Sequence, residues 1–184
     1  MLTITYFSML AFITVVWWIC RAVTWVKNSE FNYKRELQLM LVYVCIVVIA
    51  RFVFFPFGRV DGAIQPLIFD SEKILPLRIN LIPLVNLFDY EIKREAILNF
   101  VGNTLMFVPV GIVFPMVYKK LNSHTRVMLA GIVFSLAIEL LQLPFYDRVS
   151  DIDDLILNSL GYLVGYLIYL AVKIIKIKTI KNKE

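Results

Sequence analysis

Five long apolar segments separated by polar connections dominate the pattern of this 184-residue chain. A helix rises about 1.5 Å per residue and the hydrocarbon core is about 30 Å thick, so about 20 apolar residues span it. The pattern therefore predicts an all-α integral membrane protein, a bundle of five transmembrane helices. The segments are Leu2–Val26, Leu37–Phe57, Ile97–Tyr118, Arg126–Leu143 and Leu155–Ile175.

Composition narrows the class further. Hydrophobic residues make up 60% of the chain, against about 45–50% in soluble domains, and the mean hydropathy is +0.76. Both values exclude a soluble globular protein. The length leaves room for a single membrane domain over residues 1–184 and no second one.

The charges in the connections predict an orientation. The first and third connections and the C-terminal tail hold twelve Lys and Arg against three acids, whereas the other connections hold six against ten. Because Lys and Arg mark the cytoplasmic side, we expect the N-terminus outside and the C-terminus inside. The net charge of +5 then reflects topology and contact with membrane lipids, and no nucleic-acid partner is expected.

Two charged residues stand out within the apolar segments. Arg51 falls in the second segment and Glu139 in the fourth. A charge at a helix centre costs about 2.5–3.5 kcal/mol on translocon scales, so such residues usually find partners or mark functional sites. Both lie in the outer half under the predicted topology, where their opposite charges could neutralise each other. Such an ion pair could be purely structural, which is the simpler alternative to a functional site.

Polar side chains form stripes at the outer ends of three helices. Residues three, four and seven apart share one helix face, and these groups must find partners inside the bundle or line a wet cavity. We therefore expect them to form one polar site beneath the outer surface. Purely structural bonding is the alternative, with Ser150–Asp153 forming a capping box. The stripes are Asn99 and Asn103, then Ser135, Glu139 and Gln142, then Asp151, Asp154 and Asn158.

The second connection, Gly58 to Ala96, is long and partly apolar. Its extracellular stretches Pro66–Phe69 and Ile79–Val85 are expected to lie on the bundle as a lid over the polar site. Arg78 and Arg148 would then bring positive charge close to the carboxylates.

Gly161 and Gly165 form a G-x-x-x-G pattern in the fifth segment. Such a pattern lets two helices approach closely. The partner is either another helix of the same chain or a second copy, which would make a homo-oligomer.

Several motifs together resemble the VanZ-like family of bacterial membrane proteins. The resemblance runs from about Arg78 to Gly165, with Leu84 replacing the family's phenylalanine, and it predicts a core over residues 78–170. The first two helices, within residues 1–57, carry no part of it. The motifs are Arg78-Ile-Asn80-Leu81-Ile82-Pro83, Asn99-Phe-Val-Gly102-Asn103-x-x-x-Phe107-x-Pro109-x-Gly111, Ser135-x-x-x-Glu139-x-x-Gln142, and Arg148-x-x-Asp151-x-Asp153-Asp154-x-x-x-Asn158-x-x-Gly161-x-x-x-Gly165.

The resemblance implies a multi-pass protein of a Gram-positive plasma membrane. The family is similar to the accessory proteins of glycopeptide-resistance clusters, which lower susceptibility to the lipoglycopeptide teicoplanin. Many members lie outside such clusters, so a housekeeping role in the cell envelope is the alternative.

Two kinds of function stay open. The first is a binding protein whose polar site engages a lipid-linked envelope precursor or a lipoglycopeptide. The second is a membrane enzyme acting on a polyprenyl or lipid-linked phosphate, with Glu139 or Asp154 as general base or with Asp151 and Asp154 holding a divalent cation. No cofactor is expected. The predicted binding residues are Arg78, Asn80, Asn99, Asn103, Glu139, Gln142, Arg148, Asp151, Asp154 and Asn158.

Overall fold

The structure is a computed structural model that describes residues 2–28, 31–55, 60, 62–70, 78–83, 93–146 and 148–182. Five helices among them are long and apolar enough to cross a membrane, as the sequence predicts. The chain forms two compact units. Unit 1 comprises Met1–Arg78 with Gln142–Val149, and unit 2 comprises Ile79–Leu141 with Ser150–Glu184.

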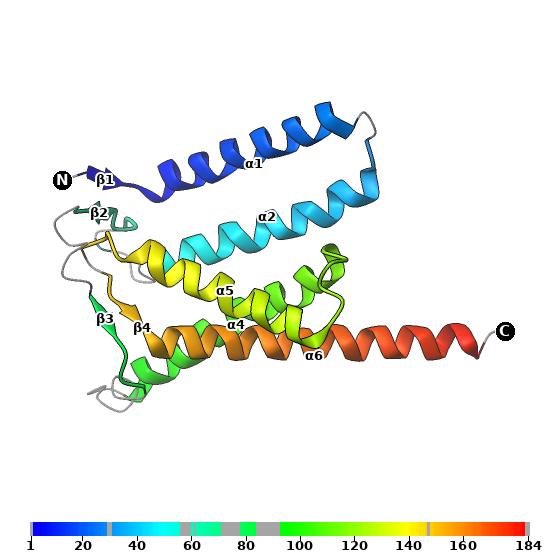
Figure 1. Cartoon of the computed structure of the whole chain (residues 1–184). Helices are drawn as coiled ribbons and strands as arrows, with labels where there is room; N and C mark the ends of the chain where they lie inside the picture. The colour runs from blue at the N-terminus through cyan, green and yellow to red at the C-terminus, as the bar shows by residue number, and fades with distance from the viewer. Residues whose placement is uncertain are drawn as a thin grey trace. The chain divides into compact units, whose positions relative to one another are not determined.

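Unit 1 holds helices α1 (Tyr6–Asn28) and α2 (Tyr33–Phe54), which run side by side in opposite directions (Figure 1). Asn32 caps α2, since its side chain accepts a hydrogen bond from the Arg35 N–H at 3.1 Å. Such a cap satisfies one of the free N–H groups of the first turn. Strands β1 (Leu2–Ile4) and β2 (Leu67–Phe69) pair antiparallel, with Thr3 opposite Ile68.

Unit 2 holds α4 (Lys93–Val117), most of α5 (His124–Gln142) and α6 (Ile152–Lys181). Strands β3 (Ile79–Asn80) and β4 (Ser150–Asp151) pair in parallel. The pairing places the chain before α4 beside the start of α6 (Figure 1).

Helices α4 and α6 pack closely because glycines lie at their contact. A Cβ added at Gly161 would overlap the backbone of Thr104, and one at Gly165 would overlap that of Val108. These glycines therefore serve contact within one chain. A homo-oligomer through the same face, the other alternative, would have to displace α4.

Some predicted boundaries are wrong. Leu2–Ile4 forms β1 rather than the start of a helix, and α4 begins at Lys93 rather than at Ile97. Arg21, counted with the first connection, lies within α1. An apolar run stops at a charged residue, whereas a helix continues because long charged side chains extend toward water from an apolar stem.

The ends of unit 2 differ in charge. In α5 the basic residue Arg126 lies in the first turn and the acidic residue Glu139 lies near the end. In α6 the order is reversed, with Asp153 and Asp154 at the start and lysines at the end. This distribution agrees with the charge pattern that predicts the orientation, and the orientation itself stays a prediction. Residues 84 and 85 of the expected lid lie outside the described residues, while Asn80 takes part in β3.

Candidate functional site

The start of α6 organises the polar side chains of unit 2. Asp151 is the N-cap residue, and its Oδ1 accepts a hydrogen bond from the Asp153 N–H at 2.9 Å. The N-cap residue is therefore Asp151 rather than Ser150, with which the expected capping box would begin. Capping occupies one oxygen of Asp151 and leaves the other to contact Asn80.

Asn80 reaches Asp151 because β3 pairs with β4. Asn80 is the register partner of Asp151, and its Nδ2 donates to Oδ2 of Asp151 at 3.2 Å. The Asn80 carboxamide oxygen also accepts from the Ile82 N–H at 3.2 Å. The amide thus bridges two segments 71 residues apart in sequence.

Glu139 contributes a carboxylate from α5. Its side chain is 3% exposed, and Oε2 accepts a hydrogen bond from the Asp151 N–H at 3.1 Å. Asp154 and Asp151 lie close enough for their charges to act on it. One end of unit 2 therefore concentrates three carboxyl groups.

Asn103 on α4 completes this group. Its Nδ2 donates to Oδ1 of Asp154 and lies 3.4 Å from Oδ1 of Asn99, one turn earlier. The predicted face shared by Asn99 and Asn103 is confirmed. We call Asn80, Asn103, Glu139, Asp151 and Asp154 the polar cluster.

A second polar contact lies deeper along α6. Asn158, 2% exposed, donates from Nδ2 to the Ser135 hydroxyl of α5 at 3.1 Å. Its carboxamide oxygen is buried and has no hydrogen-bond partner among the described residues, and the same holds for the hydroxyls of Thr104 and Tyr162. Buried polar groups are usually bonded. The sequence singled out Asn158, but Thr104 and Tyr162 gave no polar periodicity to mark them.

The remaining predicted site residues belong to unit 1. Gln142 donates to the Val53 carbonyl at 3.1 Å, and Arg148 donates to the Phe54 carbonyl at 2.9 Å. Arg78 donates to the Tyr146 carbonyl at 3.0 Å. All three bind backbone oxygens within their own unit, and the expected approach of Arg78 and Arg148 to the carboxylates stays a prediction.

Arg51 contacts a backbone oxygen and an aromatic ring of unit 1. Its Nη1 donates to the Phe55 carbonyl at 3.3 Å, and its guanidinium lies 5.7 Å from the ring centroid of Tyr6. Its predicted pairing with Glu139, a residue of unit 2, stays a prediction.

The polar cluster combines carboxylate acceptors with carboxamides that both donate and accept. Among the described residues no three His, Cys, Asp or Glu side chains are placed to hold a metal ion. The carboxylates of the cluster can accept hydrogen bonds from N–H and O–H groups of a ligand, and its carboxamides can both accept and donate them.

The family described as VanZ/LLP1 matches residues 40–175. This range is well over half of the chain and contains every residue of the polar cluster. The chain belongs to the VanZ/LLP1 family. The matched range begins inside α2 and ends inside α6, so it leaves out α1. No curated protein and no solved structure matches the chain.

Proposed function

We propose that this VanZ-like protein lowers susceptibility to lipoglycopeptide antibiotics such as teicoplanin. It does so by binding a lipid-linked envelope molecule at the polar cluster, in the outer leaflet of a Gram-positive plasma membrane. One observation carries the proposal: carboxyl and carboxamide groups from α4, α5, α6 and β3 converge at one end of unit 2.

The chemistry of the cluster favours the sugar or peptide part of such a ligand. Sugars and peptides present O–H and N–H donors, and carboxylates accept these in charge-assisted hydrogen bonds that are stronger than neutral ones. The apolar side chains of Leu140, Leu141 and Ile156 near the cluster are 53%, 61% and 46% exposed. Such surfaces suit a ligand that keeps its tail in the bilayer.

Binding of this kind predicts that protection depends on the lipid tail of the antibiotic. A lipoglycopeptide concentrates at the membrane surface, where it meets precursors that carry their own lipid. A protein that holds the polar part of either molecule at this surface reduces their encounter. A glycopeptide without a tail does not concentrate there, so the protein protects against it less.

Susceptibility of a Gram-positive host measures this function. The host expresses wild type, Glu139→Gln or Leu129→Ala at matched membrane abundance, and is challenged with teicoplanin and with a tail-less glycopeptide. We expect wild type and Leu129→Ala to protect against teicoplanin more than against the tail-less glycopeptide, and Glu139→Gln to lose protection. The amide keeps an oxygen for the Asp151 N–H but loses the charge. Leu129→Ala changes a 54% exposed side chain of the same helix, about three turns from the polar cluster.

Binding to the purified full chain in nanodiscs provides the second measurement. A hydrogen bond to a charged group contributes about 1.5–3 kcal/mol, so Glu139→Gln should weaken ligand binding about tenfold or more. Equal protection by wild type and Glu139→Gln would contradict the proposal. Lost protection with unchanged binding would contradict it too and would favour the enzyme alternative.

A further inference from the structure

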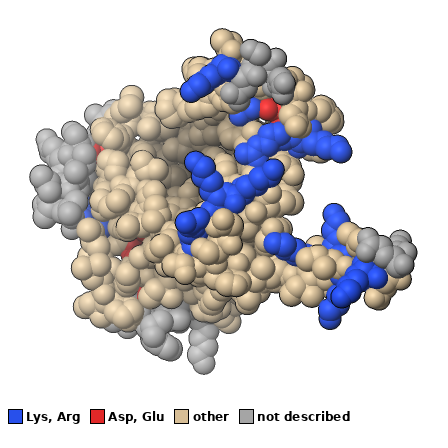
Figure 2. All heavy atoms as spheres, turned by 45° about the vertical axis from the view of Figure 1, so that its right-hand side comes forward, with Lys and Arg blue, Asp and Glu red and all other residues tan. Residues whose placement is uncertain are grey.

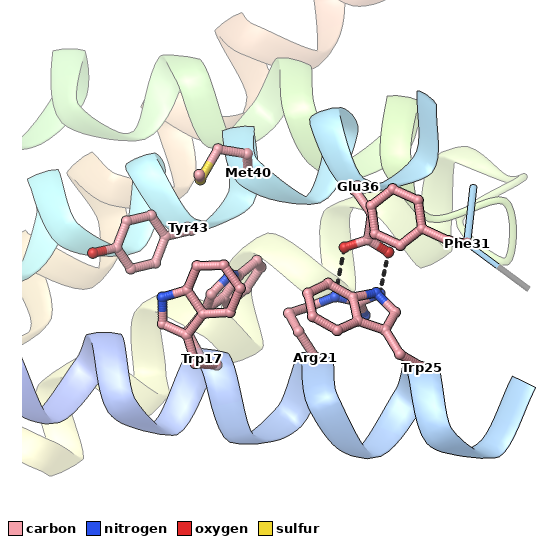
Figure 3. Close-up of a pocket in the computed structure, with 8 residues that line it drawn as sticks. Trp17, Arg21, Trp25, Phe31, Glu36, Met40 and Tyr43 are labelled. Carbon is pink, nitrogen blue, oxygen red and sulfur yellow. Dashed lines mark hydrogen bonds and ion pairs between the residues drawn. The ribbon is translucent and has the colours of Figure 1, made fainter. Parts of the chain in front are cut away.

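An aromatic pocket lies between α1 and α2, within unit 1 (Figure 3). Its volume is about 330 Å³, at the lower end of the range of about 300–1,000 Å³ typical of small-molecule sites. Most of its lining precedes residue 40, where the family match begins. The pocket is lined by Trp17, Trp18, Arg21, Trp25, Phe31, Glu36, Met40 and Tyr43.

An ion pair neutralises the charge of the pocket itself. Arg21 donates from Nε to Oε2 of Glu36 at 2.9 Å, and its Nη2 donates to the other carboxylate oxygen. The guanidinium also lies 5.7 Å from the ring centroid of Trp25. With the two charges paired, the rest of the lining is aromatic apart from Met40, so the pocket suits an apolar chain.

The helix ends next to the lining residues Phe31 and Glu36 carry basic residues, which we call the basic rim. Lys27 lies in the last turn of α1, and Lys34 and Arg35 lie in the first turn of α2. Arg35 is close enough for its charge to act on Glu36, at the pocket. Figure 2 shows blue Lys and Arg side chains exposed around the end of α1 and the start of α2. Among the described side chains, this end of the hairpin therefore carries excess positive charge.

Part of the lining of the pocket is exposed on the surface of two helices that are long and apolar enough to cross a membrane. Trp18 is 54% exposed and Met40 is 46% exposed. In a bilayer such apolar surface meets lipid chains, while basic residues at the interface meet headgroups. The apolar pocket and the basic rim thus match the two parts of one molecule, an acyl chain and an anionic headgroup.

We propose that this pocket binds an anionic phospholipid of the leaflet at the α1–α2 connection. One acyl chain lies among Trp17, Trp18 and Tyr43, and the phosphate group contacts Lys34 and Arg35. The site is separate from the polar cluster and does not depend on the function proposed for it.

The chain contains three tryptophans, and all three line this pocket. Their fluorescence therefore reports on the pocket without a label, and bromine on a lipid chain quenches it on contact. The full chain is reconstituted in phosphatidylcholine vesicles with increasing fractions of chain-brominated phosphatidylglycerol. We expect quenching that saturates at a low fraction and is reversed by unlabelled phosphatidylglycerol but not by phosphatidylcholine.

Charge variants test the headgroup contact. Each basic residue near a membrane surface contributes about 1 kcal/mol to attraction of anionic lipid, so Lys34→Gln/Arg35→Gln should weaken the preference for phosphatidylglycerol about tenfold or more. The matched control, Lys176→Gln/Lys178→Gln, removes two charges from exposed positions on α6 and should leave the quenching unchanged.

Three outcomes would overturn the proposal. Quenching proportional to the brominated fraction, and reversed equally by both unlabelled lipids, would show ordinary lipid contact. An equal effect of both charge variants would show general surface attraction. An absence of quenching by brominated phosphatidylglycerol would show that protein, such as a second copy of the chain, covers the pocket. The wild-type titration needs no variant, so it decides even if a variant fails to fold.

Discussion

Gly161→Ala is expected to destabilise unit 2 by about 3 kcal/mol, although alanine is the better helix former by about 1 kcal/mol. The reason is that the new Cβ would overlap the carbonyl oxygen and carbon of Thr104 on α4. Backbone atoms cannot rotate away as the end of a side chain can, so the helices must separate. Gly165→Ala should behave alike, because its Cβ would overlap the Val108 carbonyl.

Reversible unfolding in mixed micelles, followed by helical circular dichroism, measures this loss. Ala171→Val is the control, because it enlarges an exposed side chain on the same helix and should change stability by less than about 0.5 kcal/mol. Size-exclusion chromatography separates the two explanations of the glycine pattern. If Gly161→Ala only changed the oligomeric state and left the unfolding free energy intact, contact between copies would be the correct explanation.

The polar stripes could be predicted from sequence because helix periodicity fixes which side chains share a face. Asn99 and Asn103 lie together as expected, and Glu139 contacts Asp151. The stripe on α5 nevertheless divides, since Gln142 bonds within unit 1 while Glu139 bonds within unit 2. Periodicity gives the face of a helix but not which segment packs against it.

The contact between Asn80 and Asp151 could not be predicted from helix periodicity. It depends on the parallel pairing of two strands of two residues each, and such short strands leave no alternating pattern in the sequence. The pair of Arg21 and Glu36 was missed for a different reason. Counting both with the first connection treated them as orientation signals, although both lie within helices that extend beyond the apolar runs.

Breaking the pair of Arg21 and Glu36 is the second change from which we expect a large loss of stability. The two side chains are only 13% and 18% exposed and lie in helices able to cross a membrane. Removing one partner of a fully buried pair costs about 3–5 kcal/mol, and because these two side chains are part-buried we expect a loss of about 2–3 kcal/mol. Glu36→Gln should cost more than Arg21→Gln, because an arginine stays charged whereas a carboxyl group can take up a proton.

The double variant Arg21→Gln/Glu36→Gln should recover much of this loss, since two neutral amides can still hydrogen-bond. The expected signature is a coupling free energy of about 2–3 kcal/mol in a double-mutant cycle, read from tryptophan fluorescence during unfolding. Arg126→Gln is the control, because Arg126 is exposed and its guanidinium donates to the side chain of Asn122, which is also exposed, at 2.9 Å. Additive losses would mean that the two charges act independently, which would contradict the prediction.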